Sequence, residues 1–242
     1  MTDTDASTTE RLAKALARQA NCSRQQAEIW ITSGCVTVDG VVAEEPGMRV
    51  ASDQTITLAN NANAKPPLPV TILLHKPAGV SAQAALDLII AENITMDDRS
   101  GQRFLKRHRT GLNPSDALDT ASSGLMVFTQ DWHITRKLVD DAAKVEQEYI
   151  VEVSGDIVPY GLALLNHGLS FNGKAVPPIK VSWQNETRLR FAIKGAQPGQ
   201  ITHMCAQVGL EVLSCRRIRI GRVPMASLAA GQWRYLLGYE RF

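Results

Sequence analysis

Apolar residues in the first part of the chain recur first at helical spacing and then at the spacing of strands. An N-cap residue followed by apolar residues along one face predicts a first helix. A Ser with Gln three residues later, the capping-box pattern, predicts a second helix that a glycine ends. The prediction of the first helix rests on Thr9, Leu12, Leu16 and Ala20. The prediction of the second helix rests on Ser23, Gln26, Ile31 and Gly34.

A β-hairpin is predicted directly after these helices. Asp39-Gly40 stands between the Val-containing runs 36–38 and 41–42, and this dipeptide is a strong signal for a two-residue turn. Another apolar run at 55–58 completes a small sheet. Two short helices and this sheet are expected to form one compact domain.

The composition of the chain changes twice and predicts its division into domains. The first residues are polar and acidic, as in a disordered tail. A later stretch of small polar residues followed by prolines is typical of a linker. The expected boundaries are 1–8 for the tail, 9–58 for the small domain, 59–69 for the linker and 70–242 for a larger domain.

In the expected larger domain, short apolar runs are mixed with stretches of helical spacing. The mixture does not follow strict strand–helix alternation, so it predicts an α+β fold with a largely antiparallel sheet. Strands are expected at 71–75, 126–129, 149–153, 189–193 and 213–220, and helices at 84–92, 134–139 and 200–208.

Composition sets limits without pointing to a partner. The 242 residues are 44% hydrophobic and carry a net charge of +2, so the total charge gives no strong nucleic-acid signal. The acidic N-terminus does not resemble a signal peptide, and no apolar run is long enough to span a bilayer. The four cysteines lack metal-ligand spacing and are expected to be reduced thiols in a cytoplasmic protein without a metal site.

The candidate chemistry lies in one turn. Asp119 is followed by small residues, by Gly124-Leu125 and then by an apolar strand. A carboxylate held on a turn at a sheet edge is placed to act as a nucleophile or general base. The alternative is that Asp119 merely opens the turn, as Asp often does.

This turn and five further motifs, all in register, resemble the RNA pseudouridine synthases, in particular the branch that modifies ribosomal RNA and carries an N-terminal RNA-binding module. The resemblance covers nearly the whole chain and implies a central sheet bent around a cleft with Asp119 at its floor. The motifs are 76–80, 116–129, 145–151, 200–205, 217–221 and 228–234, and Cys22-Ser23-Arg24-Gln25 resembles a ribosomal S4-type RNA-binding domain.

Basic residues gather in two places where RNA contact is expected. One set lies on the predicted helices of the small domain, and the other lies in a basic segment just upstream of Asp119. The alternative for both sets is an ordinary solvated surface. The first set is Arg11, Lys14, Arg18 and Arg24, and the second is Arg99, Arg103, Lys106, Arg107 and Arg109.

The resemblance implies a reaction and the residues that carry it. Pseudouridine formation breaks the bond between ribose and N1 of uracil and rejoins the base through C5, with no cofactor or metal expected. Asp119 would be the catalytic carboxylate, and Tyr149 would stack on the uracil near the proton-transfer step. The pocket would be formed by Leu118, Leu125, His203 and Met204.

Three departures from the family pattern remove positive charge. Thr202 stands where an arginine would pair with the catalytic carboxylate, Ala117 replaces a second arginine, and Gln147 replaces a lysine. His203 would supply part of the missing charge only if protonated.

Three hypotheses follow from these residues. The first is a pseudouridine synthase, expected as a monomer, that acts on structured RNA, with large-subunit ribosomal RNA favoured over tRNA. The second is a family member that binds RNA without catalysis, as a chaperone or assembly factor. The third is an unrelated α+β protein with an accidental match.

Overall fold

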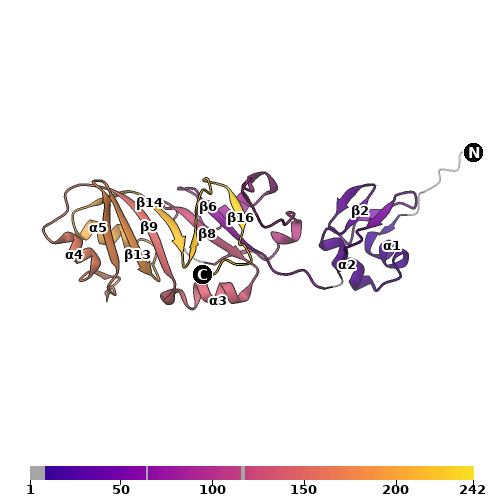
Figure 1. The fold of residues 1–242 in the computed structure, drawn as a ribbon, viewed down its shortest axis with the longest axis horizontal. Helices are drawn as coiled ribbons and strands as arrows, with labels where there is room; N and C mark the ends of the chain where they lie inside the picture. The colour runs from indigo at the N-terminus through magenta and orange to yellow at the C-terminus, as the bar shows by residue number, and fades with distance from the viewer. Residues whose placement is uncertain (1–8, 64, 116–117) are drawn as a thin grey trace, which may run out of the picture. The chain divides into compact units, whose positions relative to one another are not determined.

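The computed structural model describes residues 9–63, 65–115 and 118–242. The expected tail at 1–8, and Ala117, lie outside the described residues. Contacts divide the chain into two compact units: the smaller holds the residues up to Pro69 together with Arg103–Thr110, and the larger holds Val70–Gln102 and Gly111–Phe242 (Figure 1).

The first helix of the smaller unit, α1 (Leu12–Gln19), begins three residues later than the predicted N-cap. Its N-cap is Arg11, in an extended conformation and without a side-chain capping bond. The N-cap prediction at Thr9 is therefore wrong. The physical reason is strand pairing: β1 (Glu10–Arg11) pairs antiparallel with β4 (Arg49–Val50), which keeps these residues extended.

The second helix, α2 (Arg24–Thr32), starts as the sequence predicts. Ser23 is its N-cap, and the Ser23 hydroxyl accepts a 3.1 Å hydrogen bond from the Gln26 amide. The hairpin prediction is also confirmed. β2 (Val36–Val38) pairs with β3 (Val41–Ala43), and the turn residues Asp39 and Gly40 have φ of 51° and 80°, as a type I′ turn requires.

The smaller unit is completed by β5 (Ile56–Leu58), which pairs with β2, and by a core between the helices and this sheet. The segment Arg103–Thr110 also belongs here, although the sequence analysis placed it in the larger domain. Its Leu105 is 5% exposed and packs against Gly34. The Lys106 amide donates a 2.5 Å hydrogen bond to Glu44, and the Lys106 ammonium lies 2.5 Å from a carboxylate oxygen of Glu45.

The larger unit is built on a nine-stranded sheet. Its strand order is β12-β13-β9-β14-β8-β6-β16, with β15 paired to β14 and β7 paired to β8 (Figure 1). All of these neighbours are antiparallel except β8 and β14, which run parallel. The strands are β6 (Thr71–Lys76), β7 (Asn113–Pro114), β8 (Ser123–Thr129), β9 (Glu146–Ser154), β12 (Lys180–Asn185), β13 (Arg188–Lys194), β14 (Glu211–Ile220), β15 (Val223–Pro224) and β16 (Trp233–Tyr235).

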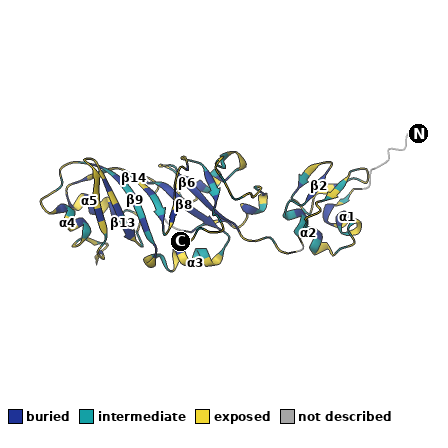
Figure 2. Cartoon of the chain, viewed as in Figure 1, coloured by how far each residue is buried: buried dark blue, intermediate teal, exposed yellow. Residues whose placement is uncertain are grey.

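Strand β9 buries one of its two faces. Its residues alternate between buried and partly exposed along its whole length, and the neighbouring strand β13 also alternates (Figure 2). Tyr149, Val151 and Val153 point into a core that includes residues of α4 (Gly161–Asn166) and α5 (Gln200–Gln207). The other face carries ion pairs, such as Glu148 with Arg190 at 2.7 Å.

Most of the expected elements of the larger unit are confirmed, including the helix near 134–139, which is α3 (Trp132–Val139). The expected helix at 84–92 is wrong. Two short 3₁₀ helices, η1 (Ala84–Leu88) and η2 (Ala91–Asn93), stand there, with Ile90 extended between them. The Asn93 side chain donates to the Leu88 carbonyl, which ends the first of these turns.

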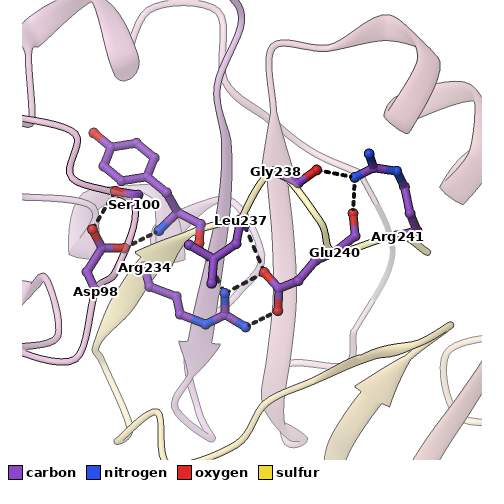
Figure 3. Close-up of polar contacts among 8 residues, drawn as sticks. Asp98, Ser100, Arg234, Leu237, Gly238, Glu240 and Arg241 are labelled. Carbon is purple, nitrogen blue, oxygen red and sulfur yellow. Dashed lines mark hydrogen bonds and ion pairs between the residues drawn. The ribbon is translucent and has the colours of Figure 1, made fainter.

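The C-terminal segment is tied down by a group of polar contacts (Figure 3). The Arg234 guanidinium makes two 2.7 Å bonds to the Glu240 carboxylate, which also accepts from the Leu237 amide at 2.8 Å. Asp98 accepts from the Tyr235 amide at 3.1 Å and from the Ser100 hydroxyl at 2.5 Å. These contacts fix the end of the edge strand β16.

Candidate active site

The turn that carries Asp119 lies immediately before β8. The Ser122 amide donates a 3.1 Å hydrogen bond to the Asp119 carbonyl, which closes the turn. The strand then starts at Ser123 and passes through Gly124, whose φ is +116°. A Cβ at this glycine would lie 2.2 Å from the Arg217 carbonyl oxygen, so only glycine permits the pairing of β8 with β14.

The buried side chain of Lys76 binds the backbone of this turn. Lys76, at the end of β6, is 0% exposed, and its ammonium donates to four backbone carbonyls. Two of them belong to the Asp119 turn: Thr120 at 3.3 Å and Ser122 at 2.6 Å. The Gly79 amide adds a 2.7 Å bond to the Thr120 carbonyl. The Lys76-Pro77 strand end and the Asp119 turn are therefore fastened together.

The Lys76 charge is in an unfavourable environment. Burial lowers the pKa of Lys76 below its usual value, and the neighbouring Arg217 lowers this pKa further. The negative charge of Asp119 acts in the opposite direction and favours the charged ammonium. The lysine and the carboxylate are thus electrostatically coupled.

The Asp119 carboxylate is bound by the backbone of α5. Its Oδ2 accepts a 3.0 Å hydrogen bond from the Gly199 amide, and Gly199 is the N-cap of α5 with φ of 75°. Over residues 9–63, 65–115 and 118–242 no salt bridge joins Asp119 to a cation. Lys194 and Arg216, two basic residues of strands β13 and β14, are both exposed.

Tyr149 lies on β9 and is 4% exposed. Its hydroxyl donates a 2.5 Å hydrogen bond to Gln147 Oε1, which also accepts from the Arg217 guanidinium at 3.3 Å. The Arg217 guanidinium carbon lies 6.0 Å from the centre of the Tyr149 ring, and Arg217 Nε donates to the Leu125 carbonyl at 2.8 Å. Gln147 suits this place because its amide oxygen accepts from both neighbours, whereas a lysine would bring only donors.

These side chains meet in one pocket beside α5. Asp119 and Tyr149 both line it, as does Leu118, so the structure brings together the two predicted catalytic residues and one predicted pocket residue. The lining is Leu118, Asp119, Ser122, Tyr149, Ala196, Gln197, Pro198, Ile201, Thr202 and Cys215.

Three other predicted pocket residues lie outside this lining. Leu125 is fully buried in β8 and packs in a separate core with Val127. Met204 is 1% exposed and belongs to the core between α5 and the sheet. His203 lies on the exposed side of α5, with its ring centre 5.4 Å from that of Phe171.

The predicted RNA-binding cations lie mainly in the smaller unit; only Arg99 is in the larger one. Arg11 and Lys14 are exposed on the N-terminal helix region. Arg18 pairs with Glu10, and Arg24 pairs with Glu28 at 3.0 Å, so part of the positive charge is locally compensated. The upstream basic residues that belong to this unit are Arg103, Lys106, Arg107 and Arg109.

Sequence reasoning missed Gly199, which binds the Asp119 carboxylate, and Cys215, which lines the pocket. Gly199 follows Pro198, and this pair before a predicted helix was a usable turn signal. Cys215 is on β14, where burial raises the pKa of its thiol, a hydrogen bond with Ser122 lowers it, and the charge of Asp119 raises it again. No local pattern distinguishes this cysteine from an ordinary strand residue.

Comparison with known families identifies the class of protein to which this fold belongs, an RNA-modifying enzyme with an RNA-binding module. Residues 10–56 match the S4 domain, and residues 70–203 match the RNA pseudouridylate synthase family. The chain therefore belongs to the RNA pseudouridine synthase family of isomerases. The resemblance deduced from the motifs is confirmed.

Several curated relatives extend over most of the chain. A ribosomal large subunit pseudouridine synthase B of Bacillus subtilis is 27% identical over 237 residues, covering 96% of this chain and 93% of that protein. The chloroplastic protein SVR1 of Arabidopsis thaliana, whose name places it among ribosomal large-subunit pseudouridine synthases, is 30% identical over 229 residues. That match covers 89% of this chain and 56% of the length of SVR1.

A solved structure supports the fold. A pseudouridylate synthase crystal structure superposes with a TM-score of 0.58 at 20% identity, covering 93% of this chain and 95% of that one. The expected α+β class with a mostly antiparallel sheet is confirmed. Within the described residues no group of three or more His, Cys, Asp or Glu side chains is placed to hold a metal, and none of the described helices is long and apolar enough to cross a membrane.

Proposed function

We propose that this protein isomerises a specific uridine to pseudouridine in structured RNA of the ribosomal large subunit, with Asp119 as the catalytic carboxylate. The observation that carries the proposal is that Asp119 and Tyr149 line one pocket although they lie on different strands and turns. Relatives in Bacillus subtilis and Pseudomonas aeruginosa are named ribosomal large subunit pseudouridine synthases, which supports the choice of RNA.

The reaction is an isomerisation in which no atom is gained or lost. The N1–C1′ bond breaks, the uracil turns, a C5–C1′ bond forms, and the proton released from C5 is balanced by a proton taken up at N1. Asp119 acts either by attacking C1′ or by removing a ribose proton. The target nucleotide must first leave its stack to enter the pocket.

The remaining pocket residues have roles that follow from their chemistry. The flat Tyr149 ring forms a wall on which uracil stacks, and its hydroxyl is held by Gln147. Leu118 and Ile201 exclude water from the reacting atoms. The S4 domain, together with the basic segment Arg103–Thr110, grips the RNA backbone.

One observation favours a second function, RNA binding without catalysis in the assembly of ribosomes. Thr202 lines the pocket where the family arginine would stand, and the described residues provide no salt bridge to Asp119. Without a salt-bridged cation the carboxylate has weaker electrostatic support, since the Lys76 charge acts on it without a direct bond and its one hydrogen bond within the described residues comes from the Gly199 amide.

Pseudouridine mapping separates the two functions. Ribosomal RNA and tRNA from cells with and without the protein are mapped chemically, and the gene is then restored as wild type or as Asp119→Asn. A modified uridine that depends on the wild type and disappears with Asp119→Asn supports the isomerase. If both forms restore ribosome assembly and neither changes any uridine, the protein acts by binding alone.

A further inference from the structure

The Asp119 carboxylate makes one hydrogen bond within the described part of the chain, and the donor is a backbone amide. Gly199 N lies 3.0 Å from Asp119 Oδ2, and the other carboxylate oxygen accepts no hydrogen bond there. Because Asp119 lines the pocket, one oxygen is anchored and one is left for the substrate.

The donor amide sits in a conformation that depends on glycine. The φ of Gly199 is +75°, which L-residues rarely adopt. A Cβ at this position would meet nothing within 4 Å, so the requirement is conformational and not a matter of space. The glycine therefore turns the peptide so that its N–H points at the carboxylate.

The helix behind this amide adds to its effect. Gly199 is the N-cap of α5, which has eight residues, and the N-terminus of a helix favours a negative charge beside it. Thr202 lies in the first turn of the same helix and lines the same pocket, but its hydroxyl carries no charge. His203 cannot take this role, because it lies on the exposed side of α5 near Phe171.

We propose that Gly199 is a positioning residue for the catalytic carboxylate: its amide, at the N-terminus of α5, orients Asp119 in place of a side-chain cation. This inference rests on the proposed role of Asp119 and adds to it the way in which a chain with Thr202 keeps that carboxylate in place. Gly199 touches no reacting atom and acts only through Asp119.

Amide hydrogen exchange tests the contact without any need for activity. The exchange rate of the Gly199 amide is measured by NMR in the wild type and in Asp119→Ala. We expect the Gly199 amide to lose protection and to shift when the carboxylate is removed, while the amide of Gly101 stays unchanged. An exchange rate at Gly199 that is the same in both proteins overturns the inference, even if the enzyme is active.

Kinetics test the consequence. Gly199→Ala keeps the surrounding space but strains the left-handed backbone, so the peptide turns away from Asp119. We expect kcat to fall about tenfold, the size of one lost hydrogen bond to a charged group, while the Kd for RNA is unchanged. Gly101→Ala is the matched control, because Gly101 also has a positive φ, +66°, and no atom within 4 Å of an added Cβ.

A second substitution shows whether the loss is one of carboxylate orientation. Thr202→Arg introduces a cation on the same helix turn, so it should recover most of the kcat lost in Gly199→Ala, while it changes the wild type less. Thr202→Met, of similar length and without charge, should not rescue. A Gly199→Ala protein that keeps wild-type kcat, or that Arg and Met rescue equally, overturns the inference. If the wild type is inactive on every RNA, only the proposed function is contradicted. The hydrogen-exchange experiment still tests the bond between the Gly199 amide and the Asp119 carboxylate.

Discussion

The Lys76 ammonium donates a 2.6 Å hydrogen bond to the Ser122 carbonyl, which joins the end of one central strand to the turn that carries Asp119. Replacement of Lys76 by Met keeps much of the side-chain volume but leaves four carbonyls without their donor. We expect the free energy of unfolding to fall by about 3 kcal/mol or more, with loss of activity. Lys174→Met, at an exposed lysine, should change the free energy of unfolding by less than about 0.5 kcal/mol. Equal denaturation midpoints for the two variants would contradict the role given to Lys76.

Gly124 should tolerate no side chain. In Gly124→Ala the new Cβ would meet the Arg217 backbone at 2.2 Å, and the φ of +116° is itself unfavourable for alanine. The strands β8 and β14 must then separate, so we expect destabilisation of several kcal/mol, or an insoluble protein. Gly111→Ala is the control, since Gly111 has φ of +70° and open space around it. Soluble expression and urea unfolding of the two variants give the comparison, and similar midpoints would show that the strands can move apart cheaply.

His108 makes the smaller unit sensitive to acid. Burial lowers the pKa of His108 to about 4, helped by the charge of Arg107. Between pH 6.5 and about 4 the unfolded chain therefore binds more protons at this residue than the folded one, so stability falls as the pH falls through this window. We expect the His108 ring to titrate near pH 4 by NMR and the loss of stability to be smaller in His108→Asn. A ring that titrates near its ordinary pKa of 6.5 would contradict this prediction and show that the ring is solvated.

Removal of residues 1–69 should do more than weaken RNA binding. The basic segment Arg103–Thr110 would lose the Glu44 and Glu45 partners of Lys106 and the Gly34 surface under Leu105. We expect RNA affinity to fall and its salt dependence to flatten, because phosphate contacts are lost. Trypsin should also cut after Arg103 and Lys106 much faster than in the full chain, while cleavage after the exposed Lys174 stays the same. Unchanged cleavage in the segment would mean that it is held by other contacts.

The pattern of apolar residues predicted most of the strands, because some bury one face, as β9 and β13 do, and others bury both faces, as β6 and β8 do. Residues 149–153 alternate, and the observed strand extends the same alternation in both directions. The prediction of a helix at 84–92 was wrong because Ile90 is extended and divides the segment into two short 3₁₀ helices. Helical spacing of apolar residues does not reveal such a break. Asp119 and Tyr149 were proposed from family motifs, and the structure places both in the lining of one pocket, while their catalytic roles stay predictions.

The support of the site was not predictable in the same way. Lysine is usually found on the surface, so the sequence gives no sign that Lys76 is buried. Only the three-dimensional structure shows that its ammonium lies among four backbone carbonyls. The Gly199 amide belongs to the backbone, so no side-chain pattern announces its bond to Asp119. Gln147 looked like the loss of a cation, whereas the structure shows an acceptor shared by Tyr149 and Arg217.

The parallel pairing of β8 with β14 has a consequence for the order in which the protein is made. Arg217 bonds to the Leu125 carbonyl across 92 residues of sequence, and Gly124 is paired with Arg217 itself. While β14 is still inside the ribosome, the nascent chain already contains the Asp119 turn. The strand that pairs with β8 beside this turn is then still missing. Contacts between such distant parts of a chain form late in folding. The Asp119 turn therefore reaches its observed place beside β14 only after residues 211–220 have been synthesised.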